Sequence, residues 1–410
     1  MENIVRQYQE LMSVNSLTGF TDAEAINYLG QLINAASDLE NLEGLDRAIN
    51  LSTQIEQQTL SSILRCYLNY NVGNAWSAKH DMKQSHSPKE RRDWELPDLE
   101  QALIWYRRAV TEKEFSRVDS GMRCRVYTNL ANQISHVGRF IEALDYYGRA
   151  LDQDSKFAMA HGNRGLLLAH YANHVFSNKE KTYLRKYAIR HAMRALNGNG
   201  EVTPDARDHF ESTVKRLNPY VSREFLSKDE ILATAPDESN DEMENCTYWC
   251  LYNQLYLNPL NDIGPLRLAA EDSLHLPNML VKLGRSHLHG FYNQLKQEFV
   301  SARYLLWKGL SRSGFVHFSD KNVILVNTWD YPCYSLGVEE MKAAFRVAYS
   351  LFDKIAFLLN EYFCLHIPEK DVKFRTLWYK RQARAKGLRC EFKERANYPL
   401  RGLFWLSKDL

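Results

Sequence analysis

Residues 339–363 read EEMKAAFRVAYSLFDKIAFLLNEYF, and this stretch decides how the second half of the chain folds. Apolar side chains recur in it at steps of three and four residues, which places them on one side of an α-helix. No Gly or Pro interrupts the stretch. The apolar positions are Met341, Ala344, Phe345, Ala348, Phe352, Ile355, Leu359 and Tyr362. We therefore expect a long helix that buries this side in a core.

Three polar residues, Arg346, Asp353 and Asn360, follow one another at intervals of seven in the same stretch. This spacing places them near one another on a single face of the helix. Two interpretations stay open. The polar line is the solvated side of the helix, as charged positions on helices usually are, or it faces a bundle interior or a partner subunit and orders a site there.

The composition is that of a globular protein. The chain has 410 residues, of which 25% are charged and 45% hydrophobic, and a net charge of +2. This length allows two or three domains, each with its own core. The charge is unevenly distributed, because residues 236–244 are acidic whereas the segment from Lys370 onward is strongly basic.

Cysteine usage and hydropathy indicate the compartment. The seven cysteines have no framework spacing, and no signal-peptide pattern opens the chain. The chain also lacks a run of about 18 apolar residues, the length that suggests a membrane-spanning helix. We expect a reduced, cytoplasmic protein that does not insert into a membrane.

The first half of the chain, up to about residue 218, has Leu, Ala and Tyr at helical spacing. Its clearest unit, residues 127–155, contains two apolar helix faces separated by the turn sequence Gly138-Arg139-Phe140. The faces consist of Tyr127, Leu130, Ala131 and Ile134, followed by Ala143, Tyr147 and Ala150. This unit resembles a tetratricopeptide repeat, although Ser155 stands where that family usually has proline.

The same pattern recurs in residues 72–110 and 164–195, each time with an insertion between the two helices, and residues 24–57 offer a further pair that would cap the array. Three related units are about the minimum for a stacked helical array, because each pair buries its apolar face against a neighbour. We therefore expect a tetratricopeptide-like helical repeat region over residues 1–235.

Arrays of this kind usually bind proteins or peptides in their concave face. Asn129, Asn132 and Asn163 fall on the first helices of the units, and we predict that they line a partner-binding groove. The alternative is that they are ordinary exposed polar positions. Nothing in this half of the chain has a catalytic pattern.

A domain boundary is expected within residues 227–245, which are polar and acidic and lack periodicity. We assign residues 246–410 to a second helical domain, so the predicted fold is all-α. In this domain we expect a loop over residues 257–264 (LNPLNDIG), a helix over residues 288–310, and one short strand or extended connection over residues 323–327.

Three blocks of the second half carry a family resemblance. They are FYNQLKQEFVSARYLLWKG at residues 291–309, HFSDKNVILVNTWDYPCYSL at residues 317–336, and the long helix over residues 339–363. Together with LNPLND they resemble the HEPN-like domain that certain bacterial proteins carry behind a helical repeat region, over residues 243–363. The resemblance implies an all-α bundle, often a homodimer or higher oligomer. In many relatives it is a metal-independent ribonuclease with a toxin–antitoxin or antiphage role.

Catalytic HEPN domains place four to six residues between an Arg and the His that follows it, so that a cation and a proton-transfer group face the RNA backbone together. Three pairs here have that spacing: Arg164 with His170, Arg185 with His191, and Arg312 with His317. Chance alone would give roughly three such pairs, so the spacing carries little information. Arg312 and His317 lie in the appropriate domain, but in a Ser- and Gly-rich loop context. We interpret this pair as structural, and the catalytic residues stay unknown.

The end of the chain departs from the family pattern. After Phe363 a basic, loop-like segment leads to RGLFWLSKDL, and no His follows His366. The resemblance would place the catalytic helix near or after this point. Either the protein belongs to an inactive branch, or the sequence ends before the active site, and the apolar run over residues 403–406 favours the second interpretation.

No metal or cofactor site is predicted. Cys246 and Cys250 have no second pair, and His287 and His289 have no nearby ligand set, so zinc is not expected. We interpret His170 and His174, which can share a helix face, as satisfied polar residues. The chain has no Gly-rich phosphate loop and no dinucleotide-binding fingerprint.

The basic segment after residue 370 mixes cations with aromatic residues. The cations are Lys373, Arg375, Lys380, Arg381, Arg384, Lys386, Arg389, Lys393, Arg395 and Arg401, and the rings are Phe374, Trp378, Tyr379, Phe392 and Tyr398. Cations attract phosphates and rings offer stacking surfaces to unpaired bases, which predicts binding of single-stranded RNA through Lys380, Arg381 and Arg384. The alternative is a solvated face, or a patch that docks on the acidic junction.

The sequence thus predicts a repeat region that holds a protein or peptide partner and a HEPN-like domain that acts on RNA, as a toxin or an antiphage defence factor. A non-enzymatic scaffold, in which both halves bind protein, is the alternative.

Overall fold

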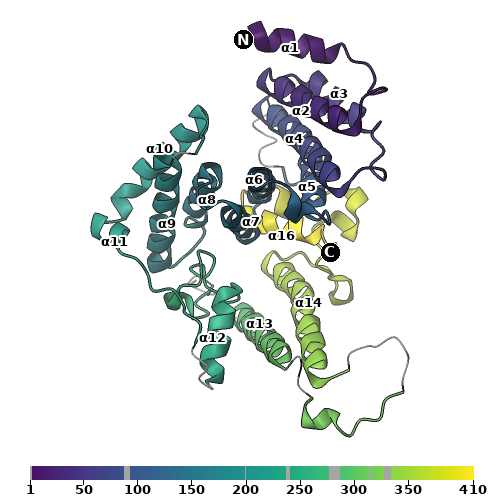
Figure 1. Cartoon of the computed structure of the whole chain (residues 1–410). Coiled ribbons are helices and arrows are strands. Elements are labelled where there is room, and N and C mark those ends of the chain that lie inside the picture. Colours follow the sequence, from purple (N-terminus) through teal and green to yellow (C-terminus); the bar gives the residue numbers. More distant parts are fainter. Residues whose placement is uncertain are drawn as a thin grey trace. The chain divides into compact units, whose positions relative to one another are not determined.

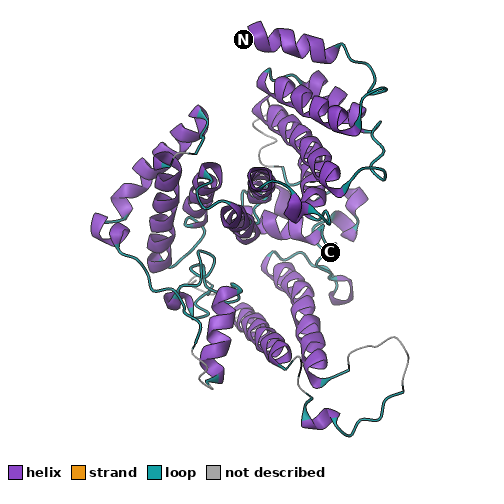
Figure 2. Ribbon diagram, viewed as in Figure 1, coloured by secondary structure: helices purple, strands orange, loops and turns teal. Residues whose placement is uncertain are grey.

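The fold is all-helical, as predicted. A computed structural model describes residues 2–86, 93–198, 200–236, 241–276, 287–312, 314, 316–326 and 334–410. Over these ranges the chain forms α-helices joined by loops and short 3-10 turns, without a strand (Figure 1, Figure 2). The helices group into two compact units, which contain residues 1–174, 185–226 and 396–406 in the first and residues 175–184, 227–395 and 407–410 in the second.

The first unit contains most of the helices. They are α1 (Glu2–Met12), α2 (Asp22–Asp38), α3 (Leu42–Ser52), α4 (Ser62–His86), α5 (Pro97–Val110), α6 (Ser120–His136), α7 (Phe140–Gln153), α8 (Ala158–Tyr171), α9 (Asn178–Asn197), α10 (Pro204–Leu217) and α16 (Tyr398–Ser407). The first residues of α9 group with the second unit. The short helix α11 (Arg223–Ser227) follows α10.

Consecutive helices of the first unit pack as pairs: α2 with α3, α4 with α5, and α6 with α7. The sequence sets their limits locally. Thr21 caps α2 in a capping box with Glu24, and Asp119 caps α6 by accepting a hydrogen bond from the backbone N–H of Met122. Gly138, with φ of +93°, turns the chain from α6 into α7. The helix pairs expected around residues 24–57, 72–110 and 127–155 are therefore present.

Small residues let the paired helices approach closely. A Cβ atom on Gly73 would lie 2.8 Å from the ring of Tyr106, so the ring of α5 lies directly against the backbone of α4. A Cβ atom on Gly165 would lie 2.9 Å from the carbonyl oxygen of Ala188, so α8 and α9 touch backbone to backbone. The alternation of small and large residues in the sequence thus reflects how the two helices of each pair pack against each other.

The last helix, α16, packs within the first unit. The apolar run over residues 403–406 supplies its buried face, since Phe404 and Trp405 are buried and the ring of Phe404 lies 5.7 Å from that of Trp94. The guanidinium of Arg401 donates a hydrogen bond to the backbone carbonyl of His136. The second compact unit therefore differs from the predicted second domain, residues 246–410, because residues 396–406 group with the first unit.

The second unit is built on one pair of long helices. Its helices are α12 (Glu242–Tyr252), α13 (His287–Ser311), α14 (Leu336–Tyr362) and α15 (Cys390–Lys393). α13 and α14 pack along each other, and their backbones meet at two glycines, because a Cβ atom on Gly309 would lie 2.6 Å from the carbonyl oxygen of Gly337. The two long helices expected from the sequence are thus confirmed.

Only part of the apolar side predicted for α14 is buried. Ala344, Ala356 and Leu359 lie in the core, whereas Phe345 and Tyr362 are 68% and 50% exposed. The reason is that α14 has one long helical neighbour, α13, and this neighbour covers a narrow line of small residues. A wide apolar stripe needs more than one covering element. The prediction that the whole stripe enters the core was wrong.

The connections of the second unit behave largely as predicted. Residues 257–264 form a loop with turns. Residues 323–326 are extended without strand pairing, and Asn327 lies outside the described residues. None of the helices in the described ranges has the length and hydropathy needed to cross a membrane.

Candidate functional site

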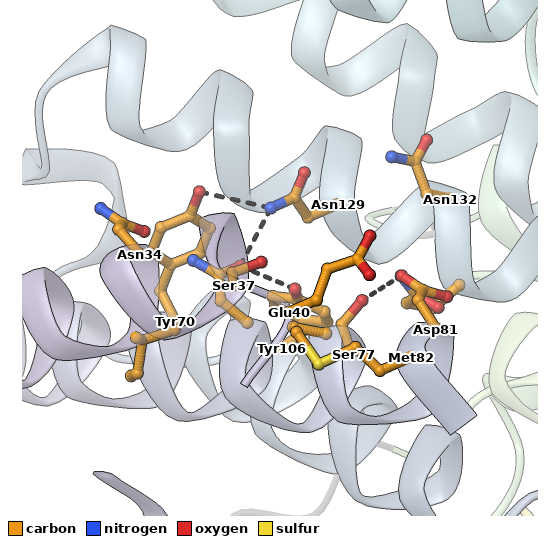
Figure 3. Close-up of a pocket in the computed structure, with 14 residues that line it drawn as sticks. Asn34, Ser37, Glu40, Tyr70, Ser77, Asp81, Met82, Tyr106, Asn129 and Asn132 are labelled. Atoms are coloured by element: carbon orange, nitrogen blue, oxygen red, sulfur yellow. Dashed lines mark hydrogen bonds between the residues drawn. The ribbon is translucent and has the colours of Figure 1, made fainter. Parts of the chain in front are cut away.

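A polar groove lies among the helices of the first unit (Figure 3). Its volume is about 550 Å³, and its walls come from α2, α4, α5 and α6. The lining residues are Ile33, Asn34, Ser37, Glu40, Tyr70, Asn74, Ser77, Ala78, Asp81, Met82, Tyr106, Asn129, Asn132 and Gln133. Two of the three predicted groove residues, Asn129 and Asn132, are among them.

The amide of Asn129 belongs to a hydrogen-bonded network. Its Nδ2 donates to Asn74 Oδ1 at 3.0 Å and to the hydroxyl of Tyr70 at 3.3 Å. The hydroxyl of the buried Tyr106 donates to the same Asn74 oxygen at 2.7 Å. This network connects α4, α5 and α6 and holds the polar wall in one arrangement.

Asn132 and Asn163 form a second network. The Oδ1 of Asn132 accepts hydrogen bonds from Asn163 Nδ2 at 3.0 Å and from the hydroxyl of Tyr147 at 2.6 Å. Asn163 is not among the residues that line the groove. Neither prediction describes these amides fully. They are not ordinary exposed polar positions, and they do more than line a groove, because their hydrogen bonds also join neighbouring helices.

The groove carries negative charge. Glu40 and Asp81 supply carboxylates, and Lys, Arg and His are missing from the described residues that line it. The side chain of Asp81 is exposed to solvent, but it lies in the wall of the groove, where many protein atoms surround its carboxylate. The resulting desolvation raises the pKa of Asp81 to about 6. A cation in the groove would favour the charged form of Asp81.

The carboxylate of Asp81 was not predicted, although the spacing of polar residues on α4 carries a signal for it. Tyr70, Asn74, Ser77 and Asp81 recur on α4 at steps of four, three and four residues, which makes a polar row along one face of the helix. Amides and hydroxyls in such a row can bond the backbone of an extended peptide, while the carboxylates attract a basic side chain or an amino terminus.

The Arg and His of the candidate catalytic pair have separate partners. Arg312 forms an ion pair with Glu340 of α14. His317 Nδ1 lies 2.8 Å from the hydroxyl of Ser319, and the same nitrogen accepts a hydrogen bond from the backbone N–H of Ser319. The structure thus gives Arg312 a role in holding α13 to α14, and gives His317 a role in capping a 3-10 turn.

In the other two Arg–His pairs of this spacing, both in the first unit, each histidine contacts another histidine. His170 and His174 lie with their Nε2 atoms 3.3 Å apart, and His161 and His191 with their Nδ1 atoms 2.9 Å apart. Desolvation by burial lowers the pKa of all four imidazoles. These histidines are satisfied polar residues of the helix pairs, and no group of three metal-binding side chains occurs in the described parts of the chain.

The polar line of α14 holds the segment that follows the helix. Asp353 accepts a hydrogen bond from the backbone N–H of Phe374 at 3.0 Å. Asn360 bonds both backbone groups of Ile367, each at 3.1 Å. Arg346 is exposed. Two of the three residues therefore order residues 367–374 against their own helix.

In the basic segment, the cations and the aromatic rings differ in their exposure to solvent. Most cations of residues 373–395 are exposed, whereas Phe374, Trp378, Tyr379 and Phe392 are buried. Trp378 packs 5.0 Å from the ring of Phe392, and its Nε1 donates to the backbone carbonyl of Phe374 at 2.7 Å. The prediction that these rings stack on RNA bases was wrong, because they are the hydrophobic core of this segment.

The three predicted RNA-binding cations share one exposed loop. The backbone N–H of Lys380 donates to the carbonyl of Gly387 at 3.0 Å, which closes residues 380–387 into a tight loop. Arg381 lies within the loop in a left-handed conformation, with φ of 51°. The side chains of Lys380, Arg381 and Arg384 are exposed on it. A polyanion can therefore reach all three.

Residues 255–272, which include the LNPLND block, form a polar anchor for α13. Arg303 of α13 makes a bidentate ion pair with Asp272, at 2.8 and 2.9 Å, and donates to the backbone carbonyl of Leu255. The buried Asn261 bonds the backbone of Leu251 and Tyr256. These contacts give the block a structural role.

The comparison with protein families bears on this second unit. Residues 281–410 match the family described as LA2681-like HEPN. This range contains α13, α14 and the basic segment, so the chain carries a HEPN-like domain there. No family match supports the repeat resemblance of the first unit. A search among curated proteins found no match to the chain.

Proposed function

We propose that this protein couples a peptide-binding repeat unit to an RNA-directed HEPN-like region, in the role of a toxin or an antiphage defence factor. The observation that carries the RNA part is the family match over residues 281–410. The polar groove of Figure 3 supports the partner-binding part. In this proposal the repeats hold a partner segment and the HEPN-like region acts on RNA.

The exposed cations of the basic segment would hold the RNA backbone. Lys and Arg neutralise phosphates without regard to sequence, and they release counterions when they do so. Because the rings of this segment are buried, base stacking contributes little. We therefore expect RNA binding with weak sequence preference and strong salt dependence.

The groove would hold an extended peptide segment of a partner. Its amides and hydroxyls match the hydrogen-bonding groups of a peptide backbone, and Glu40 and Asp81 favour a segment that carries a basic side chain. Peptides rich in acidic residues are disfavoured by the same two carboxylates.

We further propose that the protein forms a homodimer through the exposed aromatic side of α14. Phe345 and Tyr349 stack on each other with ring centroids 5.9 Å apart, and both are more than half exposed. Aromatic side chains of this kind are enriched at protein interfaces. Light scattering of the full chain should show a dimer that Phe345→Ser with Tyr349→Ser converts to a monomer.

An RNA assay without metal tests the main proposal. The full chain is incubated with end-labelled single-stranded RNA in the presence of a chelator, and both binding and cleavage are followed. Replacement of Lys380, Arg381 and Arg384 by Glu should lower the affinity steeply. The slope of log affinity against log salt should flatten by about 0.7 for each phosphate that the variant no longer neutralises.

A matched control keeps this assay specific. Lys156, Arg207 and Lys215 are exposed cations of the first unit, and their replacement by Glu changes the net charge equally. If both triple variants weaken RNA binding to the same extent, the basic loop has no special role. If neither RNA binding nor cleavage occurs with the unmodified chain, the RNA part of the proposal is rejected.

A non-enzymatic scaffold is the second candidate, and one observation favours it. Arg312 is neutralised by Glu340, and His317 caps a turn, so this pair does not present a free cation beside a proton-transfer group. Absence of RNA cleavage, together with partner capture that depends on the groove, would support the scaffold.

The groove can be blocked without unfolding its helix. Ser37→Arg places a long cation in the groove, whereas Gln31→Arg places the same side chain on an exposed position of α2 outside the lining set. A partner from the native host that the unmodified chain and Gln31→Arg both capture, and Ser37→Arg does not, would occupy the groove. Equal capture by all three proteins would place the partner elsewhere.

A further inference from the structure

Two cysteines lie side by side on α12 in the second unit. Cys246 and Cys250 are four residues apart, which puts them on one face of the helix, and their Sγ atoms are 3.9 Å apart. Cys246 is half-buried, whereas Cys250 is 1% exposed. The pair therefore consists of one thiol that solvent can reach and a second thiol directly behind it.

The surroundings favour a thiolate on the outer cysteine. A hydrogen bond from Cys250 lowers the pKa of Cys246 to about 7, against the opposing effect of partial burial, and the guanidinium of Arg303 lowers it further. Glu242 acts in the opposite direction. The pKa of Cys250 is raised by that hydrogen bond and by burial, and the carboxylate of Asp272 adds to this effect. Cys246 thus has the lowered pKa expected of an attacking cysteine, and Cys250 has the raised pKa expected of a resolving cysteine.

We propose that Cys246 and Cys250 form a redox-active dithiol that hydroperoxides oxidise to an intrahelical disulfide. The Cys246 thiolate attacks the peroxide, so an S–O bond forms and the O–O bond breaks. With hydrogen peroxide the departing hydroxide is protonated to water. The Cys250 sulfur then attacks the sulfenic sulfur, so the S–S bond forms, the S–O bond breaks, and the hydroxide leaves as water with the thiol proton. The dithiol loses two electrons and the peroxide gains them.

The geometry of the helix allows a disulfide between Cys246 and Cys250, but only with strain. Residues four apart in an α-helix have Cα atoms about 6 Å apart, which is within the range that disulfides span, but their Cβ atoms are about 5–6 Å apart, against about 3.8 Å in a disulfide. The S–S bond therefore tightens the C-terminal half of α12. A strained disulfide is reduced more readily than a relaxed one, so we expect reversible oxidation.

Oxidation would act on the contacts of α12 with α13. Glu242 accepts hydrogen bonds from Lys308 at 2.7 Å and from the hydroxyl of Tyr304 at 2.9 Å. At the other end, Asn261 donates to the carbonyl of Leu251, next to Cys250, at 2.9 Å. Tightening of α12 shifts these contacts, which would connect the redox state of the pair to the HEPN-like helices. This inference does not depend on the proposed RNA activity.

Mass spectrometry of the full chain tests the proposal. The reduced protein is treated with micromolar hydrogen peroxide, its remaining thiols are alkylated, and it is digested with trypsin. We expect the peptide that contains Cys246 and Cys250 to lose two hydrogen atoms and to escape alkylation, and dithiothreitol should restore it. The exposed thiols of Cys364 and Cys390 serve as internal references and should react at least tenfold more slowly with peroxide at pH 7.

Two variants separate the roles of the cysteines. In Cys250→Ser, Cys246 should still react but stop as a sulfenic acid that dimedone traps. In Cys246→Ser, the buried Cys250 should stay reduced. The proposal is overturned if the folded, unmodified chain keeps both thiols under conditions that oxidise Cys364, or if the disulfides that appear join two chains.

Discussion

The polar groove of the first unit and the basic segment of the second both mix polar side chains with aromatic rings, but the two regions arrange them in opposite ways. In the groove, the hydroxyls of Tyr70 and Tyr106 are hydrogen-bonded to amides of the wall, and Tyr147, which does not line the groove, donates to the wall residue Asn132. In the basic segment, rings such as Trp378 are packed on one another, and the cations point to solvent. The aromatic residues thus support polar recognition in one region and bury a small core in the other.

This difference shows which physical variable should control each region. A hydrogen-bonded groove responds to the loss of single partners and to protonation, because its polar groups depend on one another and some of them are desolvated. A cation surface over an aromatic core responds to salt, because its charges are screened by ions.

The core of the basic segment should be the most sensitive to truncation. Trp378→Ala removes a ring that is 0% exposed and leaves a large cavity, so we expect the free energy of unfolding of the second unit to fall by about 3–5 kcal/mol. Chemical denaturation with the exposed variant Lys380→Ala as control measures this. A Trp378→Ala protein of normal stability that no longer binds RNA would show that the ring contacts RNA after all, and the contrast would fail.

Acid should weaken the first unit through its paired histidines. His80 and His136 lie with their Nε2 atoms 3.5 Å apart, and desolvation lowers the pKa of each to about 4. In the unfolded chain these two imidazoles titrate near pH 6.5. Between pH 6.5 and 4 the unfolded chain therefore binds more protons than the folded chain, and the free energy of unfolding falls as the pH falls. Each unit of pKa difference is worth about 1.4 kcal/mol.

Thermal unfolding between pH 7 and pH 4 checks the effect of acid. The double variant His80→Gln with His136→Gln should show a smaller loss of melting temperature across this range than the unmodified chain. Identical pH profiles would mean that these two imidazoles are already solvated in the folded protein.

The amide networks of the groove should contribute less than the aromatic core. Asn132→Ala leaves the hydroxyl of the buried Tyr147 and the amide of Asn163 without their shared acceptor, which should cost about 1–3 kcal/mol. Asn34→Ala removes an exposed amide of the same groove and should change stability by about 0.5 kcal/mol or less. Equal, small effects of both changes would indicate that water replaces the Asn132 network.

The smallest effect on folding is expected from the exposed cations. Replacement of Lys380, Arg381 and Arg384 by Glu should leave the melting temperature nearly unchanged, because exposed substitutions usually alter stability by about 0.5 kcal/mol or less each. The same variant should lose most of its RNA affinity. If it instead unfolds or loses its oligomeric state with unchanged RNA affinity, the loop is a docking surface for protein.

Much of the fold was predictable because it depends on short-range patterns. The apolar spacing and the absence of Gly and Pro over residues 339–363 predict α14, and the Gly-Arg-Phe turn at residue 138 predicts the break between α6 and α7. The candidate sites were less predictable. Asn129 and Asn132 do line a groove, but the carboxylate of Asp81 was missed, and the rings of the basic segment were assigned to the wrong environment.

Local sequence patterns account for the helices, the turns between them, the alternation of small and large residues in the helix pairs, and the cations of the basic segment. Each of these follows from neighbours within about one to four positions along the chain. The tertiary structure alone decided which sides are covered. It buried Trp378 against Phe392, left Phe345 exposed, and packed α16 within the first unit. Periodicity shows which residues share a face, but the element that covers this face comes from elsewhere in the chain, and its distance and shape are not written in the local pattern.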